Sequence, residues 1–249
     1  MITFAEQGYE LTAEHRARLV AADQVLGRLR AKRESRVAAA DCSGLATWAF
    51  DSYLQLGLYR IVSLADGIAA EWNAFRVVNC AILTRSMMET AAAWWHLLDR
   101  AVALLQKEDI RGAHSLAMKA MFGMRLEQQG KPSFPKSTSV VTQVDRLEKT
   151  FPGVKHFYEA LCEVLHPNCE AMWLFGYMNP GRRELLLDGH QAAKEPAAVE
   201  KILFGFLMFE VAEKCLDVYL EKIRPQIVAL ERRFGTHPTS WPGKSDPER

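Results

Sequence analysis

Two long stretches of the chain, residues 45–72 and 74–107, contain no proline and consist largely of small and straight-chain residues that favour helices. Each is long enough for roughly eight helical turns. The second stretch is apolar on nearly every side, which is typical of a helix at the centre of a bundle. Together they predict an antiparallel helical pair that breaks near Asn73, and with it an all-α fold.

The remaining pattern predicts one helical bundle with a small insertion. Helical periodicity and turn signals place further helices over residues 12–35, 109–122, 141–151, 157–165, 197–224 and 227–234. Two short apolar runs near 173–187, separated by Asn-Pro-Gly, predict a β-hairpin. We therefore expect a single domain of six to eight helices over residues 1–235, followed by a disordered tail over 236–249.

The near-zero net charge of the chain excludes a strong long-range electrostatic field around it. The chain carries 31 Lys and Arg against 30 Asp and Glu, so its formal net charge is only +1. This balance argues against a dedicated nucleic-acid binder. No apolar run approaches the ~18 residues of a membrane span, and the five cysteines are scattered. A cytoplasmic protein with reduced thiols and no membrane partner is expected.

One local exception to this balance is the basic face of the predicted first helix. It has an excess of four positive charges, from Arg16, Arg18, Arg28, Arg30, Lys32, Arg33 and Arg36 against Glu14, Asp23 and Glu34. A solvated helix face explains this excess. The alternative is a contact with phosphate groups or RNA, which would make binding steeply dependent on salt.

A narrow stripe of charged residues runs along the apolar stretch 74–107. At 100° per residue, Glu89 and His96 fall within about 40° of Arg85, with Asp99 and Arg100 at the edges of the stripe. A charged side chain on an apolar helix must reach water or a partner. The stripe therefore predicts either a polar cleft or a simple ion pair between Arg85 and Glu89 that joins neighbouring helices, with His96 and Asp99 near solvent.

A second cluster of polar residues lies on the predicted helix that ends before Pro167. Its members share one face, opposite the apolar side of the helix: His156, Glu159, Glu163 and His166. A solvated face also explains this arrangement. In the functional interpretation, His166 sits on a rigid corner next to Asn168, where an imidazole that titrates near neutral pH suits proton transfer.

These two segments together resemble a bacterial family of uncharacterised all-helical proteins. The family pattern has Arg-x-x-x-Glu on one helix, as in residues 85–89, and Tyr-x-x-Leu-Ser-x-x-x-His-Pro on another, as in residues 158–167. The resemblance covers residues 45–220, and Cys162 stands where the pattern more often has serine. It implies that Arg85, Glu89 and His166 face one another, but it implies no activity.

A looser resemblance connects the chain to HEPN helical ribonucleases and nucleotide-binding domains. Their catalytic arginine precedes a histidine by four to six residues, a spacing that the arginines of the central predicted helices lack, because Arg111 and His114 are too close and Arg85 and His96 too far apart. A metal-free RNA-cleaving site would have to combine Arg85 with His166 from separate helices.

The sequence contains no complete metal-binding or cofactor-binding motif. Zinc would need Cys162, His166, Cys169 and His156 at an unfamiliar spacing. A di-iron bundle would need a second Glu-x-x-His pair beside Glu163 and His166, with Glu71, Glu89 and Glu210 as further ligands. Phosphate-loop, dinucleotide-binding and serine-hydrolase motifs are absent from the sequence. No metal and no cofactor are predicted.

The leading functional hypothesis is a cytoplasmic binding protein whose polar cleft takes a small anionic ligand or a partner. The lining residues are Arg85, Glu89, His96 and His166, with Asn168 at the rim. Arg85 anchors the anion, Glu89 orients it, and His166 donates or senses a proton. The alternative is a HEPN-like ribonuclease of the toxin or phage-defence type, with His166, Arg85 and Glu89 as catalytic residues and RNA as substrate. A third hypothesis is a homodimer through the apolar helix 197–224.

Overall fold

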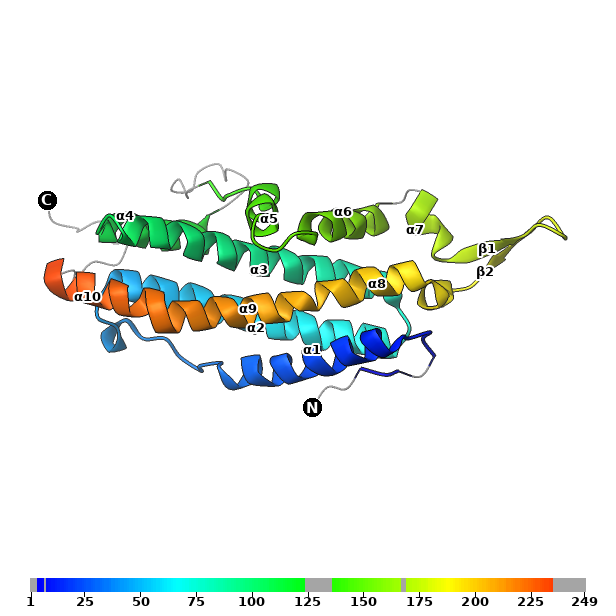
Figure 1. Ribbon diagram of the computed structural model, residues 1–249, viewed down its shortest axis with the longest axis horizontal. Coiled ribbons are helices and arrows are strands. Elements are labelled where there is room, and N and C mark those ends of the chain that lie inside the picture. Colours follow the sequence, from blue (N-terminus) through cyan, green and yellow to red (C-terminus); the bar gives the residue numbers. More distant parts are fainter. Residues whose placement is uncertain (1–3, 7, 124–135, 167–168, 235–249) are drawn as a thin grey trace, which may run out of the picture. The chain divides into compact units, whose positions relative to one another are not determined.

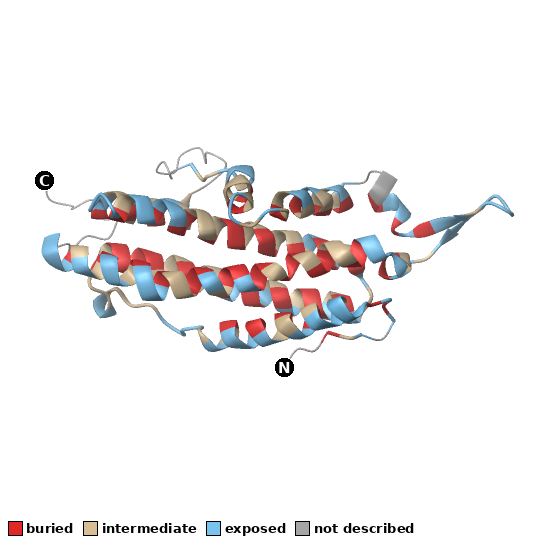
Figure 2. Cartoon of the chain, in the orientation of Figure 1, coloured by how far each residue is buried: buried red, intermediate tan, exposed pale blue. Residues whose placement is uncertain are grey.

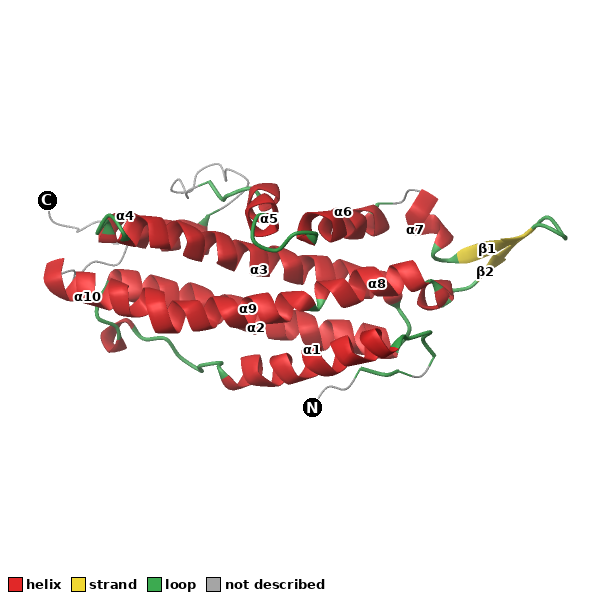
Figure 3. Cartoon of the chain, viewed as in Figure 1, coloured by secondary structure: helices red, strands yellow, loops and turns green. Residues whose placement is uncertain are grey.

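The fold is known from a computed structural model, which describes residues 4–6, 8–123, 136–166 and 169–234, without the side chains of Cys169 and Glu170. The predicted 236–249 tail and Asn168 lie outside the described residues. The structure is helical apart from two short strands, so the all-α prediction is confirmed (Figures 1 and 3).

The helices lie close to the predicted ranges. They are α1 (Ala13–Ala31), α2 (Leu45–Asn73), α3 (Val77–Leu105), α4 (Ile110–Phe122), α5 (Val140–Glu148), α6 (Val154–Leu165), α7 (Cys169–Trp173), α8 (Pro196–Gly205), α9 (Leu207–Val218) and α10 (Arg224–Phe234). Short 3-10 turns cover Ala39–Asp41 and Gln191–Lys194. The break after Asn73 is where it was expected, and Phe75 turns the chain there with a φ of 59°.

The predicted hairpin is also confirmed. Strands β1 (Gly176–Asn179) and β2 (Glu184–Leu187) pair antiparallel, with Tyr177 opposite Leu186 and Met178 opposite Leu185. The first predicted strand starts late because its first residue, Trp173, ends the short helix α7.

The described chain packs into two units. Unit 1 comprises residues 1–33, 57–96 and 139–214, and unit 2 comprises 34–56, 97–138 and 215–249. Helices α2, α3 and α9 contribute residues to both. The prediction of a single domain over 1–235 stays a prediction, and each unit is described by itself.

Unit 1 is built around the buried aromatic residue Trp72. The Tyr9 ring stacks on Trp72 with ring centroids 4.1 Å apart, and the Tyr9 hydroxyl donates to the Trp72 carbonyl at 2.6 Å. A Cβ added to Gly57 of α2 would lie 2.3 Å from the indole nitrogen of Trp94 on α3. Glycine at residue 57 therefore allows the two helices to pack tightly around Trp94, as Figure 2 illustrates by the buried residues along both.

Unit 2 contains a buried carboxylate that caps a helix. Glu231 is 2% exposed and accepts hydrogen bonds from the backbone N–H groups of Ala46 and Thr47, at 2.8 and 3.1 Å. The hydroxyls of Ser43 and Thr47 donate to its other oxygen, at 2.5 and 2.6 Å. The carboxylate also lies at the N-terminus of α2, where the positive end of the helix dipole favours a negative group. Both oxygens of the buried Glu231 carboxylate are therefore hydrogen-bonded.

The last helical stretch departs from the predicted 197–224 helix in two respects, and the first is that Phe206 separates α8 from α9. Between α9 and α10, residues Tyr219–Ile223 form a π-helical turn, closed by a bond from the Arg224 N–H to the Tyr219 carbonyl. Pro225 was expected to end or kink the helix, because its ring displaces the carbonyl four residues earlier. A wider turn relieves that clash while the helix continues into α10.

Candidate functional site

The predicted pair Arg85 and Glu89 lies on α3 within unit 1. The Arg85 Nη2 is 3.2 Å from the Glu89 Oε1, in an i,i+4 ion pair. The two side chains are 31% and 27% exposed, so each reaches solvent without being fully hydrated. This part of the predicted stripe is therefore a real charged contact on an otherwise apolar helix.

Tyr158 of α6 joins this pair and closes a three-residue cluster, which we call the Arg85 triad (Arg85, Glu89 and Tyr158). Its hydroxyl accepts a hydrogen bond from the Arg85 Nη2 at 3.2 Å and donates one to the Glu89 Oε1 at 3.0 Å. The guanidinium carbon lies 5.3 Å from the centre of the Tyr158 ring, within cation–π range. Helices α3 and α6 are thereby connected at one polar point.

The Arg85 triad leaves one donor without an acceptor. The Arg85 Nε is buried and makes no hydrogen bond with any residue that the structure describes. A buried N–H without an acceptor costs about 1–3 kcal/mol, and more when the group is charged. The Arg85 side chain as a whole is 31% exposed, so a ligand oxygen that reached the Nε from this exposed side would satisfy the donor.

Cys162 lies one helical turn after Tyr158, on the same side of α6. Burial raises the pKa of its thiol, although the positive charge of Arg85 opposes that shift. Burial likewise raises the pKa of Tyr158, and the nearby Glu89 adds to the effect. Both groups therefore stay protonated at neutral pH, so the triad together with Cys162 presents one cation, one carboxylate and two neutral donors.

The two predicted histidines lie farther along the same helices. His166 directly follows α6 in an extended conformation and is exposed. Eight residues separate it from Tyr158, or about 12 Å along the axis, and no hydrogen bond or ion pair joins it to Arg85 or Glu89. His96 is half-buried on α3, seven residues after Glu89. The structure thus assembles Arg85 and Glu89, and a cleft shared with His166 stays a prediction.

Tyr158 is the residue that the sequence did not single out. It belongs to the segment 158–167, but a tyrosine on the apolar side of an amphipathic helix is ordinarily part of the core, and Tyr158 is indeed only 7% exposed. The signal that was available is the spacing of Tyr158 and Cys162, which places both on the α6 face that turns toward Arg85.

No group of three His, Cys, Asp or Glu side chains in the described ranges is arranged to hold a metal ion. The zinc alternative included Cys169, whose side chain lies outside those ranges. Among the helices that the structure describes, none combines the length and the apolar character needed to cross a membrane.

The basic face of α1 is largely neutralised by acidic residues within the same unit. Arg18 contacts Glu14 at 2.6 Å and Glu200 at 3.0 Å. Arg28 donates to both oxygens of Glu213 at 2.8 Å, and these bonds lower the pKa of that carboxyl. The local excess of positive charge in the sequence is therefore compensated in three dimensions.

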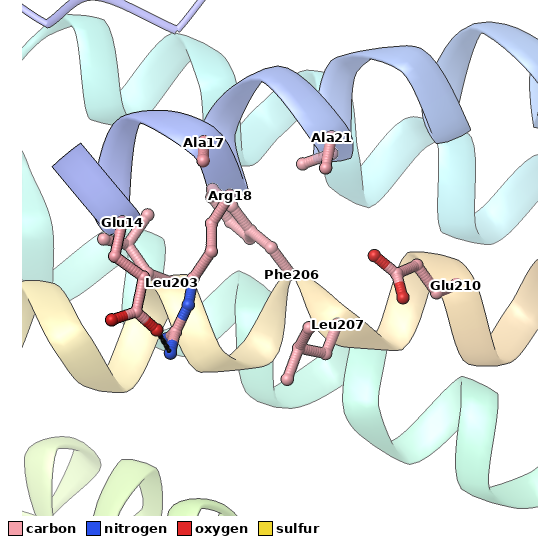
Figure 4. A pocket seen from close by; sticks show the side chains of 9 residues that line it. Glu14, Ala17, Arg18, Ala21, Leu203, Phe206, Leu207 and Glu210 are labelled. Carbon is pink, nitrogen blue, oxygen red and sulfur yellow. Dashed lines mark hydrogen bonds and ion pairs between the residues drawn. The ribbon is translucent and has the colours of Figure 1, made fainter.

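A hollow in unit 1 lies between α1 and the segment α8–α9. It has a volume of about 270 Å³ and is lined by Glu14, Ala17, Arg18, Ala21, Ala22, Leu203, Phe206, Leu207 and Glu210. Figure 4 shows the Glu14–Arg18 pair at one end and Glu210 at the other. Because Arg18 is already held by two carboxylates, this hollow offers an apolar surface and not an anion site.

No family model, curated protein or solved structure matches this chain. Its function therefore has to be inferred from the geometry of its own residues.

Proposed function

We propose that this chain is a binding protein that holds a small anionic ligand at the Arg85 triad. The observation that carries the proposal is the buried Arg85 Nε, a charged donor that has no acceptor among the described residues. Carboxylates and phosphates are the natural acceptors, because the planar guanidinium matches their paired oxygens.

Glu89 narrows the class of ligand. Its carboxylate lies 3.2 Å from the Arg85 Nη2, so a bound anion would sit near a second negative charge. That repulsion is offset if the ligand also carries a hydroxyl or amine that donates to Glu89. A small hydroxy acid or a sugar phosphate has both groups, and acetate has only one. Glu89 thus orients the ligand while Arg85 anchors it.

The two histidines have a secondary role in this proposal. His166 and His96 lie beyond the triad along α6 and α3, where they would contact only a ligand long enough to extend about 10 Å from Arg85. The ribonuclease alternative requires His166 and Arg85 to act on the same phosphate. It is supported by the sequence pattern only, so RNA is included in the test as a competing substrate.

A cytoplasmic location remains part of the proposal. It is supported by the four cysteines within the described residues, Cys42, Cys80, Cys162 and Cys215, which are all free thiols.

The test is isothermal titration of the purified protein with a hydroxy acid, a sugar phosphate, acetate and inorganic phosphate. We expect the first two to bind at least tenfold more tightly than the last two. Arg85→Lys keeps the charge but lacks the Nε donor and should weaken binding at least tenfold. Arg224→Lys, a change of the same chemistry in unit 2, should leave binding unchanged.

Three results would contradict the proposal. One is the absence of binding to every member of the panel, and another is equal binding by the wild type and Arg85→Lys. The third is cleavage of a labelled RNA that is lost in both Arg85→Lys and His166→Ala, which would establish the ribonuclease instead.

A further inference from the structure

The segment Met172–Leu187, which we call the hairpin arm, exposes an unusual number of large apolar side chains. Eight of its sixteen residues are apolar, bulky and at least 36% exposed: Met172, Trp173, Phe175, Tyr177, Met178, Leu185, Leu186 and Leu187. Leu187 alone is 79% exposed. Figure 2 shows the two strands almost entirely in the colour of exposed residues.

Both faces of the hairpin are apolar. The register places Tyr177 and Leu186 on one face, and Met178 and Leu185 on the other. A hairpin that lies at the surface of a protein ordinarily buries one face and presents polar side chains on the other. An isolated two-stranded hairpin is also only marginally stable in water. The arm therefore needs a covering surface on both sides.

The strands also have open edges. Each has one neighbour within the described residues, because the sheet consists of β1 and β2 alone. Unpaired backbone N–H and C=O groups along an edge strand are a template for pairing with another chain. Glu184 at the start of β2 is charged, but residues 185–187 contain neither a proline nor a charge, so nothing along these three residues opposes such pairing.

The exposed surface is large enough for a stable interface. Taking roughly 200 Å² for each large apolar residue, the exposed fractions amount to about 800 Å². This area is a sum over both faces of the hairpin and over residues 172–175 beside it. It equals the ~800 Å² that each partner contributes to an interface of standard size.

The charges of the arm favour a protein over a membrane. The turn between the strands carries Arg182 and Arg183, next to Glu184 at the start of β2. These charges at the tip oppose entry into a hydrocarbon layer. With Asp188 at the base, the positive and negative charges of the hairpin cancel, so it has no net attraction for anionic lipids.

We propose that the hairpin arm is a homodimerisation surface, covered by the arm of a second copy of this chain. A two-fold interface uses the same patch on both copies. The arm meets that requirement, since it is apolar on both faces, has a net charge of only +1 and is open along its edges. It differs from the predicted dimer surface on helix 197–224, where Ile202, Phe206 and Phe209 are already buried within the chain.

The experiment is sedimentation equilibrium of the full chain over about 1–100 μM, a range that spans the affinity expected of such an interface. The wild type should be a dimer at the upper end. The double variant Leu185→Lys/Leu187→Lys should weaken self-association at least 100-fold, since it places charges on a buried apolar face. The matched control is Leu56→Lys, which changes a leucine of α2 that is 62% exposed outside the arm, and it should dimerise normally.

A variant of the other hairpin face and a check of folding distinguish loss of the dimer from loss of the fold. Tyr177→Lys alters the opposite face and should also give a monomer, and circular dichroism should show an unchanged fold in every variant. A wild type that is monomeric at 100 μM would overturn the proposal, as would a double variant that dimerises like the wild type. Monomeric protein that sediments with phosphatidylcholine vesicles, and loses this property in the double variant, would show that a membrane covers the arm instead.

Discussion

Each unit contains a cluster of one carboxylate, one tyrosine and one arginine. The two clusters differ in which nitrogen atoms of the arginine have an acceptor. In unit 2, Asp51 accepts the Tyr219 hydroxyl at 2.5 Å and contacts Arg224 through both Nε and Nη2, at 3.1 and 3.0 Å. We call this the Asp51 triad. In unit 1 the Arg85 triad also combines a carboxylate, a tyrosine and an arginine, but its arginine uses only Nη2.

This difference separates a structural ion pair from a candidate binding site. The Asp51 carboxylate is 14% exposed and already engages the Nε and Nη2 of Arg224 and the Tyr219 hydroxyl. The Glu89 carboxylate of the Arg85 triad is about twice as exposed, at 27%, and the Arg85 Nε donor is unused. Residue types alone therefore do not distinguish the two clusters, because the distinction lies in whether each donor has found an acceptor.

The largest expected effect is the loss of the Asp51 carboxylate in unit 2, whose side chain is 14% exposed. Asp51→Asn leaves Arg224 and Tyr219 without a charged acceptor, and we expect it to lower the free energy of unfolding by about 2–4 kcal/mol, less than for a fully buried pair because Arg224 is partly exposed. The matched change Glu89→Gln should cost less than about 1 kcal/mol, as for other half-exposed pairs. Urea denaturation followed by circular dichroism measures both, and equal losses would remove the distinction between the triads.

The next largest expected effect is on the reactivity of Cys42, a cysteine beside the Asp51 triad. Burial raises the pKa of the Cys42 thiol to about 11, and the neighbouring Asp51 adds to that shift. The thiolate is the reactive form, so a raised pKa lowers reactivity at every pH below it. At pH 8 alkylation by iodoacetamide should be about 100-fold slower than for an unperturbed thiol. Mass spectrometry of the modified residue measures the rate.

The same experiment has an internal control. In the Asp51→Asn variant the negative charge is gone, and alkylation of Cys42 should accelerate. An unchanged rate in this variant would mean that burial alone protects the thiol.

The smallest expected difference concerns the two tyrosine hydroxyls. Tyr219→Phe removes a hydrogen bond to a buried carboxylate and should cost about 1.5–3 kcal/mol. Tyr158→Phe removes a bridge between two half-exposed groups, which water can partly replace, so about 1 kcal/mol is expected. Thermal unfolding of both variants tests this order, and a larger loss for Tyr158→Phe would indicate that the Arg85 triad is primarily structural.

The helical architecture was predictable because it depends on periodicity. The apolar stretch 74–107 and the turn near Asn73 required no knowledge of distant contacts, and the Asn-Pro-Gly turn was sufficient to indicate the hairpin. The same reasoning placed Arg85 and Glu89 together, because residues four apart on a helix are neighbours.

The third member of each triad was not predictable from the sequence. Tyr158 and Tyr219 are buried aromatic residues, and nothing in a hydrophobicity pattern distinguishes a tyrosine whose hydroxyl has a partner from one that only fills space. The acceptor of Arg18 was equally inaccessible, since Glu200 lies 182 residues away along the chain. An arginine whose charge is not balanced on its own helix can be paired with a carboxylate of another helix. The sequence alone therefore does not show which donors have no acceptor.

The π-helical turn over residues 219–223 determines which side chains can share Asp51. In an α-helix two residues five apart point roughly 140° away from each other, whereas a π-helical turn of about 4.4 residues reduces the angle to roughly 50°. The wider turn thus aligns Tyr219 and Arg224. Residue count consequently matters more than identity at the exposed positions 220–222: many side chains would be tolerated there, but deleting any one of them would rotate the guanidinium out of reach of its carboxylate.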